Sequence, residues 1–374
     1  MRRMNGFITF LLIVLCIAGT GLGTAFLKHE NQLSVRRQEK MAQLNKQLQP
    51  INEKRKELQQ KDKDWQKTLE DEKKGKPCVV LCFNTMDKEV YDTMYDMMEP
   101  YGFRGTFALK DGHVPGYNED AVSGSEVSEM LDEGWEYAIA EDLNQGKATD
   151  NNLTFLNETE SEQTDGEEDS KEEAPVSYQD QLDAHLSTLD EYQMSRPETL
   201  LCSQEQYDSL FEAALAEKGI RTVCILNEEE FPVLDEQEGE IRVLQAGVYT
   251  QQDMKVEESL QNAVANNRSM VICVNSVRKI SENAGYDLSL TKFSSLLTML
   301  KNLEEQGEIY VLTFSEFQQY EDQKTASYEK LASQYAKFKE DMTQQLEELE
   351  KQEQEAVDAL DTDETEESGI WKYL

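Results

Sequence analysis

Polar side chains with the capacity for chemistry or binding stand beside several short apolar runs of this sequence. Asn84 and Asp87 follow the run 78–83, Asn275 follows the run 269–274, and Trp135 and Arg196 lie near two further apolar segments. If these runs are parallel strands, their carboxyl ends meet at one edge, where α/β proteins place their binding sites. We therefore predict that any binding function centres on these five residues.

Other sites that sequence patterns reveal are absent from the chain. It has three histidines, His29, His113 and His185, and none is four residues from another. There is no Cys-x-x-Cys pair, zinc-ligand spacing, glycine-rich phosphate loop or Gly-x-Ser-x-Gly turn. A formal net charge of −38 argues against nucleic acid as a partner.

Cysteines outside the N-terminal apolar segment all fall in or beside predicted strands. A pair such as Cys78 and Cys82 shares a strand face but lies about 13 Å apart, too far for a disulfide. We predict that these residues are free, buried thiols that act as small apolar side chains. They are Cys78, Cys82, Cys202, Cys224 and Cys273.

Apolar runs without alternation, separated by amphipathic segments, position the polar residues. A run of this kind is typical of a strand buried on both faces, and the intervening periodicity is helical. The order predicts an α/β domain with a parallel sheet, open or closed into a barrel. The expected strands are 77–83, 105–109, 135–140, 220–226, 269–274 and 308–314, and the expected helices are 90–98, 127–133, 207–218 and 288–306.

The order of these segments resembles the polysaccharide deacetylase (NodB-homology) family. The resemblance runs through VVLCFN, YGFRGTFAL, LDEGWEYAIA, SRPE, AEKGIRTVCIL, SMVICVN and LEEQGEIYVLTFSEF, and covers about residues 77–317. It lies more in the spacing of elements than in identities. The resemblance implies a distorted (β/α) barrel that removes acetyl groups from amino sugars with a bound divalent metal.

The residues that the family uses for catalysis are replaced in this chain. Asn84 and Thr85 stand where the family has a general base and a metal ligand, and an amide is no base at neutral pH. Ala140 and Asn144 fall on the places of two histidine ligands, and Asn275 on the place of a third histidine. We therefore expect a catalytically degenerate member with no bound metal or other cofactor.

Several family features are kept only in part. Arg196 echoes an Arg-Pro turn of the family, and Trp135 could stack on a sugar ring or pack in the core. If a metal did bind, Asp87 and Asp142 would be the nearest replacement carboxylates. The groove candidates are therefore Asn84, Asp87, Trp135, Arg196 and Asn275.

An apolar, uncharged segment precedes this domain. Residues 6–27 are long enough to cross a bilayer as a helix, after Arg2 and Arg3. We expect a retained single-pass anchor, assigned to residues 1–27, with the bulk of the chain outside the cytoplasm. The alternative is a signal peptide that is cut after the small residues 23–25.

Polar helical segments flank the domain. Residues 28–76 carry a heptad seam that includes Met41, Leu44 and Leu58, with Arg55 and Asp62 as interruptions and a kink expected near Pro50. Residues 318–374 continue as a helix with an acidic and aromatic tail. The two segments either self-associate between chains or pair antiparallel within one chain, which would return Trp371 and Tyr373 to the membrane surface.

An acidic segment interrupts the predicted domain. Residues 145–176 form an insertion in which 157–173 hold nine acids against one lysine, a composition that favours disorder. Three functions stay open: a pseudoenzyme that binds cell-wall or surface glycan or acts as a scaffold, an active carbohydrate deacetylase, and a purely structural stalk.

Overall fold

The computed structural model describes the chain in two compact units. Unit 1 comprises residues 1–73 and 326–374, and unit 2 comprises residues 74–325. The expected domain boundaries were 76/77 and 317/318. The described residues are 2–110, 112–140, 177–208, 210, 212–227, 230–234, 241–251, 255–279 and 287–370, and the side chains of 2–27, 29, 30, 33 and 360–370 are outside the description.

Unit 2 is built around a closed barrel of seven parallel strands. Each strand pairs in parallel with the next along the chain from β1 to β7, and β7 pairs back with β1 in the register Val79↔Met270 to Phe83↔Val274. The sheet predicted from sequence is therefore closed and not open. The strands are β1 Cys78–Phe83, β2 Thr106–Lys110, β3 Glu136–Ala140, β4 Thr199–Cys202, β5 Thr222–Asn227, β6 Arg242–Val248 and β7 Met270–Val274.

An eighth strand lies beside the barrel. β10 (Tyr310–Leu312) pairs in parallel with the first half of β1, in the register Cys78↔Tyr310 to Val80↔Leu312, whereas β2 pairs with the end of β1. A separate two-residue ladder joins β8 (Val277–Arg278) to β9 (Leu288–Ser289), directly after β7.

Two apolar layers form the core because every strand is buried on both faces. One layer fills the barrel and contains alternate residues of each strand, among them Val80, Ala108 and Cys224. The other layer contains the remaining strand residues and the helix faces that cover them, such as Phe107 and Leu297. The alternation assigns each strand residue to the interior or to the exterior of the barrel.

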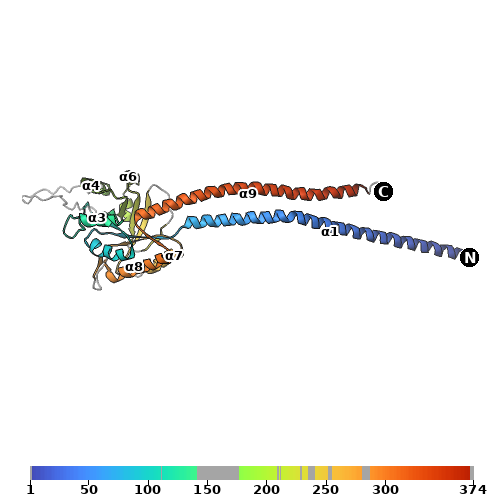
Figure 1. Cartoon of the computed structure of the whole chain (residues 1–374), viewed down its shortest axis with the longest axis horizontal. Helices are drawn as coiled ribbons and strands as arrows, with labels where there is room; N and C mark the ends of the chain where they lie inside the picture. The colour runs from blue at the N-terminus through green and yellow to red at the C-terminus, as the bar shows by residue number, and fades with distance from the viewer. Residues whose placement is uncertain are drawn as a thin grey trace, which may run out of the picture. The chain divides into compact units, whose positions relative to one another are not determined.

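Helices and short turns connect successive strands, and Figure 1 shows them around the outside of the sheet. The predicted helix 207–218 is wrong as one element, since the structure divides it into α5 and α6. Sequence inspection also missed α4, α7, β4 and β6. The connecting elements are η1 Val90–Tyr95, α2 Asp96–Met98, η2 Glu99–Tyr101, α3 Gly124–Asp132, α4 Tyr178–Glu191, α5 Gln204–Asp208, α6 Glu212–Glu217, α7 Val256–Ala265 and α8 Leu290–Glu305.

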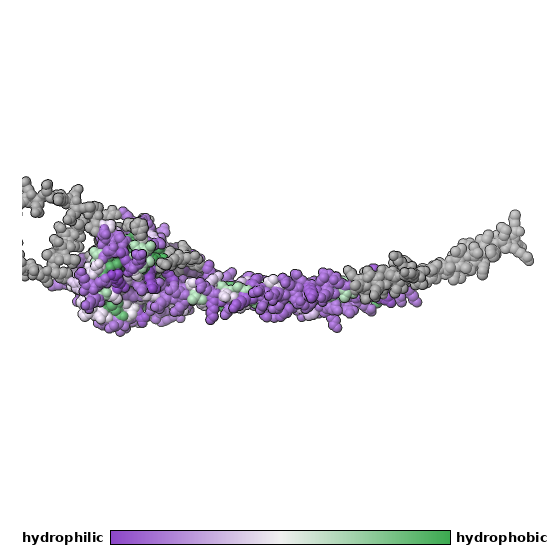
Figure 2. Space-filling view, turned by 90° about the horizontal axis from the view of Figure 1, so that it is seen from above, coloured by the Kyte–Doolittle hydropathy of each residue, from purple (hydrophilic) through white to green (hydrophobic). Residues whose placement is uncertain are grey.

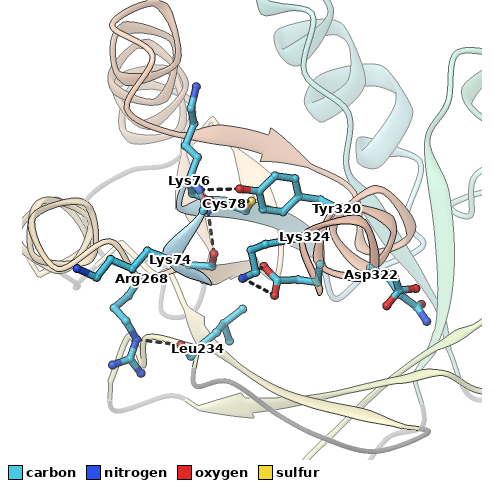
Figure 3. A network of polar contacts seen from close by, with 12 residues as sticks. Lys74, Lys76, Cys78, Leu234, Arg268, Tyr320, Asp322 and Lys324 are labelled. Atoms are coloured by element: carbon cyan, nitrogen blue, oxygen red, sulfur yellow. Dashed lines mark hydrogen bonds and ion pairs between the residues drawn. The ribbon is translucent and has the colours of Figure 1, made fainter. Parts of the chain in front are cut away.

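The amino end of the barrel is covered by the first turns of α9 (Phe314–Ile370). Phe314 and Phe317 are buried and pack on the inner layer of the barrel. The Tyr320 hydroxyl accepts a hydrogen bond of 2.6 Å from the backbone N–H of Lys76, which leads into β1 (Figure 3). Entry and exit of the chain are therefore joined at this end, and the opposite end carries the strand carboxyl termini.

A partly buried carboxylate strengthens the same end. Glu136, the first residue of β3, accepts hydrogen bonds from the Thr313 hydroxyl at 2.5 Å and the Ser315 backbone N–H at 3.2 Å. Burial raises the pKa of Glu136, although these hydrogen bonds oppose the rise. The carboxylate thereby stabilises the amino terminus of α9.

Unit 1 is an antiparallel pair made by α1 (Arg2–Lys74) and the later turns of α9, with the beginning of α1 and the end of α9 at the same end of the pair (Figure 1). Ile51 and Leu58 form one apolar cluster with Leu349 and Met342. Trp65 contacts the rings of Tyr335 and Phe338, with centroids 6.3 and 6.2 Å away. Antiparallel pairing within one chain is confirmed.

The seam differs in detail from the sequence prediction. Met41 is 55% exposed and does not belong to it, and α1 continues through Pro50. The predicted interruptions are cross-helix contacts: Arg55 bonds Glu353 at 2.7 Å, and Asp62 accepts from the Tyr335 hydroxyl at 2.8 Å. A polar group at a seam position favours one register over others, so these contacts fix the pairing.

The surface of the paired helices is polar. Figure 2 shows predominantly hydrophilic residues along the described part of this pair, which is expected when each helix buries its apolar seam against the other. Over the residues whose side chains are described, we find no helix with an apolar stretch long enough to traverse a bilayer. The expected span 6–27 lies outside those residues, as do the acidic insertion 145–176 and the Trp371–Tyr373 tip.

Candidate functional site

The carboxyl end of the barrel has a polar arc among its described inward-facing residues. Residues alternate between interior and exterior along each strand, so the interior positions Cys82, Ala108 and Cys273 assign Asn84, Lys110 and Asn275 to the interior side of the barrel. The strand registers place Asn84 level with Asn275, and Lys110 one inner step further out on β2. Asn84 and Asn275 directly follow β1 and β7, and Lys110 is the last residue of β2; β1 pairs with both of the other strands. We call these three residues the mouth ring.

The mouth ring lies where the barrel interior meets solvent. Cys82, Ala108 and Cys273, one step below, are fully buried, whereas all three ring residues are partly exposed. Described inner positions on the other strands include the apolar residues Ala140, Leu226 and Val248. The mouth thus joins a polar arc to an apolar arc, a combination that suits ligands with both hydroxyl groups and C–H faces.

Two amides form the centre of the arc. The Asn84 Nδ2 amide faces Asn275 Oδ1 at 3.5 Å, and the Asn84 backbone N–H donates to the Val274 carbonyl at 2.9 Å. The predicted proximity of Asn84 and Asn275 is therefore confirmed. Neutral amides donate and accept hydrogen bonds but do not take up a proton at neutral pH, so this pair can bind a ligand and cannot serve as a general base.

Lys110 is the cation of the mouth ring. It ends β2, directly opposite Ala140 of β3, and its backbone N–H lies 3.5 Å from the Met86 sulfur. Small residues stand below and beside it, because Ala108, Ala138 and Ala140 are all interior. Space for the lysine stem is therefore provided by alanine methyl groups.

Buried thiols lie beneath the ring. A hydrogen bond with Cys82, together with burial, raises the pKa of Cys273, and the positive charge of Lys110 opposes that rise. Burial likewise raises the pKa of Cys82 and of Cys224. Because only a thiolate is a good nucleophile, these side chains are inert apolar filling at neutral pH. The prediction that the cysteines outside the N-terminal segment are free and buried is confirmed.

The loop after β2 adds an aromatic surface beside the mouth ring. The His113 ring stacks on Tyr117 with centroids 4.0 Å apart, and His113 Nδ1 lies 3.1 Å from the Lys110 carbonyl oxygen. Tyr117 is 41% exposed, which makes it one of the few large rings of unit 2 that faces solvent. A stacked and exposed ring is a suitable platform for a sugar.

Thr85 and Asp87 follow Asn84 but point to local structure. The Thr85 hydroxyl is buried and accepts from the Asp87 backbone N–H at 3.1 Å. The Asp87 carboxylate is partly exposed and lies 3.6 Å from the Arg278 guanidinium, which Glu89 also contacts at 2.9 Å. Asp87 therefore lies at the rim of the mouth with its charge compensated.

Trp135 is not at the carboxyl end. It precedes β3 and is 4% exposed, and it packs in the outer layer with ring centroids 5.7 Å from Phe83 and 5.8 Å from Tyr95. A Cβ at Gly105 would meet the Phe83 ring at 2.5 Å and the Trp135 ring at 3.1 Å, so this stack needs a glycine beneath it. Of the two roles considered for Trp135, the structure has core packing, and the predicted place of this residue at the carboxyl end is wrong.

Arg196 is also at the other end of its strand. It precedes β4, and its guanidinium is bidentate with Asp190, Nε to Oδ1 at 3.0 Å and a second short bond to Oδ2. The hydrogen bond from Arg196 lowers the pKa of Asp190. Arg196 therefore joins a turn on the amino side and does not contribute to the mouth.

The donor set at the mouth does not suit a divalent metal. The implied ligand positions hold Thr85, Ala140 and Asn275, whereas transition metals favour imidazole, thiolate or carboxylate. Across the part of the chain that the structure describes, no three histidine, cysteine, aspartate or glutamate side chains lie close enough to hold an ion. Asn144 and Asp142 lie outside the described residues.

Sequence inspection missed three residues of this surface, Lys110, His113 and Tyr117. The predicted strand ended at Leu109, which left Lys110 in a loop with no assigned direction. The available signal was the alternation from Thr106 through Ala108 to Lys110, which places the lysine on the inner row once Ala108 is known to be interior.

Comparisons with known proteins give only distant structural similarity. No protein-family model and no curated protein matches the sequence. Among solved structures, the peptidoglycan deacetylase PdaC from Bacillus subtilis is 12% identical, with 68% of this chain and 96% of that chain covered and a TM-score of 0.37. The peptidoglycan N-acetylglucosamine deacetylase Bc1960 is 15% identical, with 65% and 89% covered and a TM-score of 0.36.

A third similar structure is a mutant of BA3943, described as a CE4 family pseudoenzyme with restored enzymatic activity. It is 14% identical, covers 65% of this chain and 67% of that chain, and has a TM-score of 0.33. Identities and TM-scores this low leave family membership a proposal, and the site is interpreted from its own residues.

Proposed function

We propose that this protein is a glycan-binding, catalytically degenerate relative of the polysaccharide deacetylases. The observation that carries the proposal is the amide pair Asn84–Asn275, within 3.5 Å at the carboxyl ends of adjacent strands. Amides bind hydroxyl and acetamido groups by reciprocal hydrogen bonds, and they supply neither a base nor a good metal ligand. The exposed aromatic side chain of Tyr117, beside the mouth ring, adds a stacking surface.

Equilibrium binding with product detection tests the proposal. The full chain is titrated with a fluorescent chitin hexasaccharide, and acetate is measured in the same samples. We expect saturable binding without acetate release above the blank. Replacing both amides, Asn84→Leu with Asn275→Leu, should weaken binding by about tenfold or more, because two hydrogen-bonding groups of about 1 kcal/mol each are removed.

An asparagine away from the mouth provides the matched control. Asn302→Leu alters an exposed side chain near the end of α8 and should leave affinity unchanged. Catalytic acetate release that the double variant abolishes would favour the active deacetylase. Absence of binding in the wild-type chain would favour the purely structural function or a scaffold without glycan.

Membrane attachment and an extracytoplasmic location are further parts of the proposal. Support comes from the uncharged apolar segment 6–27, which follows two arginines. Alkaline carbonate should leave the chain in the membrane pellet, and protease added to intact cells should remove the barrel. Release of a shortened, soluble chain would instead indicate a cleaved signal peptide.

A further inference from the structure

The mouth ring contains a charge that the proposed function does not use. Lys110 lies on the inner row of β2 between the amide pair and the loop that carries His113 and Tyr117. Within the described residues, no carboxylate pairs with its ammonium group. Lys110 is therefore a partly exposed cation on the inner face of the barrel, without a counter-ion among the residues that the structure describes.

Three described carboxylates that follow β1 and β7 in the chain share one cation. Asp87, Glu89 and Asp287 surround one guanidinium, that of Arg278, at 3.6, 2.9 and 3.7 Å. The adjacent amide of Asn275 uses its oxygen toward Asn84, which leaves Nδ2 as a donor toward the mouth. Lys110 and Asn275 thus present donors on the two sides of Asn84, from β2 and from the end of β7, and these donors match a group with two or more acceptor oxygens.

We propose that the mouth binds an anionic glycan, with Lys110 as the residue that selects a carboxylate or phosphate group on the sugar. This inference rests on the proposed glycan-binding function and specifies its ligand class. The sugar ring lies against the apolar arc and Tyr117, and its anionic group faces Lys110 and Asn275. The ammonium repels a cationic amino sugar at the same place, which gives selectivity by charge.

Three fluorescent oligosaccharides of equal length test the inference with the full chain in 150 mM salt. They are a neutral chitin hexasaccharide, a hyaluronan hexasaccharide with carboxylates, and a chitin hexasaccharide phosphorylated at its 6-hydroxyls. We expect at least one anionic probe to bind about tenfold more tightly than the neutral probe, the usual worth of a charge-assisted hydrogen bond. The two anionic arms distinguish carboxylate from phosphate.

Variants of Lys110 assign that preference. Lys110→Met keeps the stem and should reduce the affinity for the anionic probe to that for the neutral probe in the same variant, whereas Lys110→Arg should retain the preference. Lys301→Met is the matched control. Lys301 lies on the outer helix α8, and its ammonium contacts the Glu304 carboxylate at 2.8 Å. Thermal melting of each variant verifies that the barrel is folded.

The outcomes separate this inference from the proposal beneath it. Equal binding of neutral and anionic probes by the wild type, or an anionic preference that survives in Lys110→Met, overturns the role of Lys110 while glycan binding stands. Failure of all three probes to bind overturns the proposed function and this inference together. The inference is supported if Lys110→Met loses the anionic preference while Lys110→Arg and Lys301→Met retain it.

Discussion

Replacement of Trp135 by alanine tests the assignment of this residue to the core. The indole is 4% exposed and contacts two rings, those of Phe83 and Tyr95. Truncation of a buried aromatic side chain costs about 3–5 kcal/mol, since both burial and the contacts on the cavity wall are lost. We expect the free energy of unfolding of unit 2 to fall by that amount, with glycan affinity unchanged in the folded fraction.

The buried cysteines provide an assay that reports on the barrel alone. All five described cysteines are buried within it, and Cys16→Ser removes the remaining thiol. When reclosing is faster than reaction, the rate of thiol labelling follows the open population, so 3–5 kcal/mol corresponds to roughly two to three and a half powers of ten. Trp135→Ala should therefore be labelled at least about a hundredfold faster than the parent.

A surface aromatic serves as the control for this prediction. Tyr117→Ala changes a ring that is 41% exposed, so labelling should change by less than about threefold. Glycan affinity should instead decrease in this variant. The opposite pattern, with labelling unchanged and glycan binding lost in Trp135→Ala, would refute the assignment of Trp135 to core packing.

Three further predictions concern packing, titration and pairing. Gly105→Ala should destabilise unit 2 by about 1–3 kcal/mol by overpacking, whereas Gly124→Ala, whose Cβ meets nothing within 4 Å, should not; similar urea midpoints for both would contradict this. Folding raises the pKa of Glu136, so ionisation of this carboxyl group lowers the free energy of unfolding at neutral pH. That loss disappears as the pH falls toward 4.5, and the free energy of unfolding increases accordingly. Glu136→Gln should make the urea midpoint depend less on pH between pH 7 and 5. The same pH dependence in the wild type and the variant would contradict this prediction. Leu44→Cys should cross-link with Ala356→Cys within one chain, because the seam pairs residues whose numbers sum to about 400, and bands only at the dimer mass would reject the register.

The barrel was predictable because its strands are buried on both faces. Cys78–Phe83 and Met270–Val274 are uninterrupted apolar runs, and a run of this kind has few alternatives to a parallel strand. β6 was not predicted because Arg242 and Gln245 interrupt its apolar sequence. Only the residues that face the barrel interior, Leu244, Ala246 and Val248, are uniformly apolar. Barrel closure depends on the pairing of β7 with β1, a contact between distant segments that periodicity does not encode.

The candidate site was predictable only in part, for a related reason. Asn84 and Asn275 each follow a strand, so chain direction alone places them at the carboxyl end. Trp135 and Arg196 precede their strands, and proximity to a strand in sequence does not place a residue at its carboxyl end. Lys110 required the strand to extend one residue further than apolar composition indicates.

The helical pair gives a similar lesson. The heptad spacing predicted a seam, and Arg55 and Asp62 seemed to interrupt it. In the structure these two positions bond Glu353 and Tyr335 of the opposite helix. The same register places Leu44 opposite residue 356, an offset that the heptad spacing did not predict, because a repeat predicts an interface but not the offset of its two sides.

Hydrogen exchange of the full chain with and without glycan tests the central claim, that ligand binds at the carboxyl end of the barrel, most directly. The probe is whichever oligosaccharide binds most tightly in the assays above. We predict that glycan slows exchange of backbone amides in 84–87, 112–117 and 275–278, with no change in 133–137 or 194–198. Protection confined to the segments around Trp135 and Arg196, with none at the mouth ring, would contradict the account.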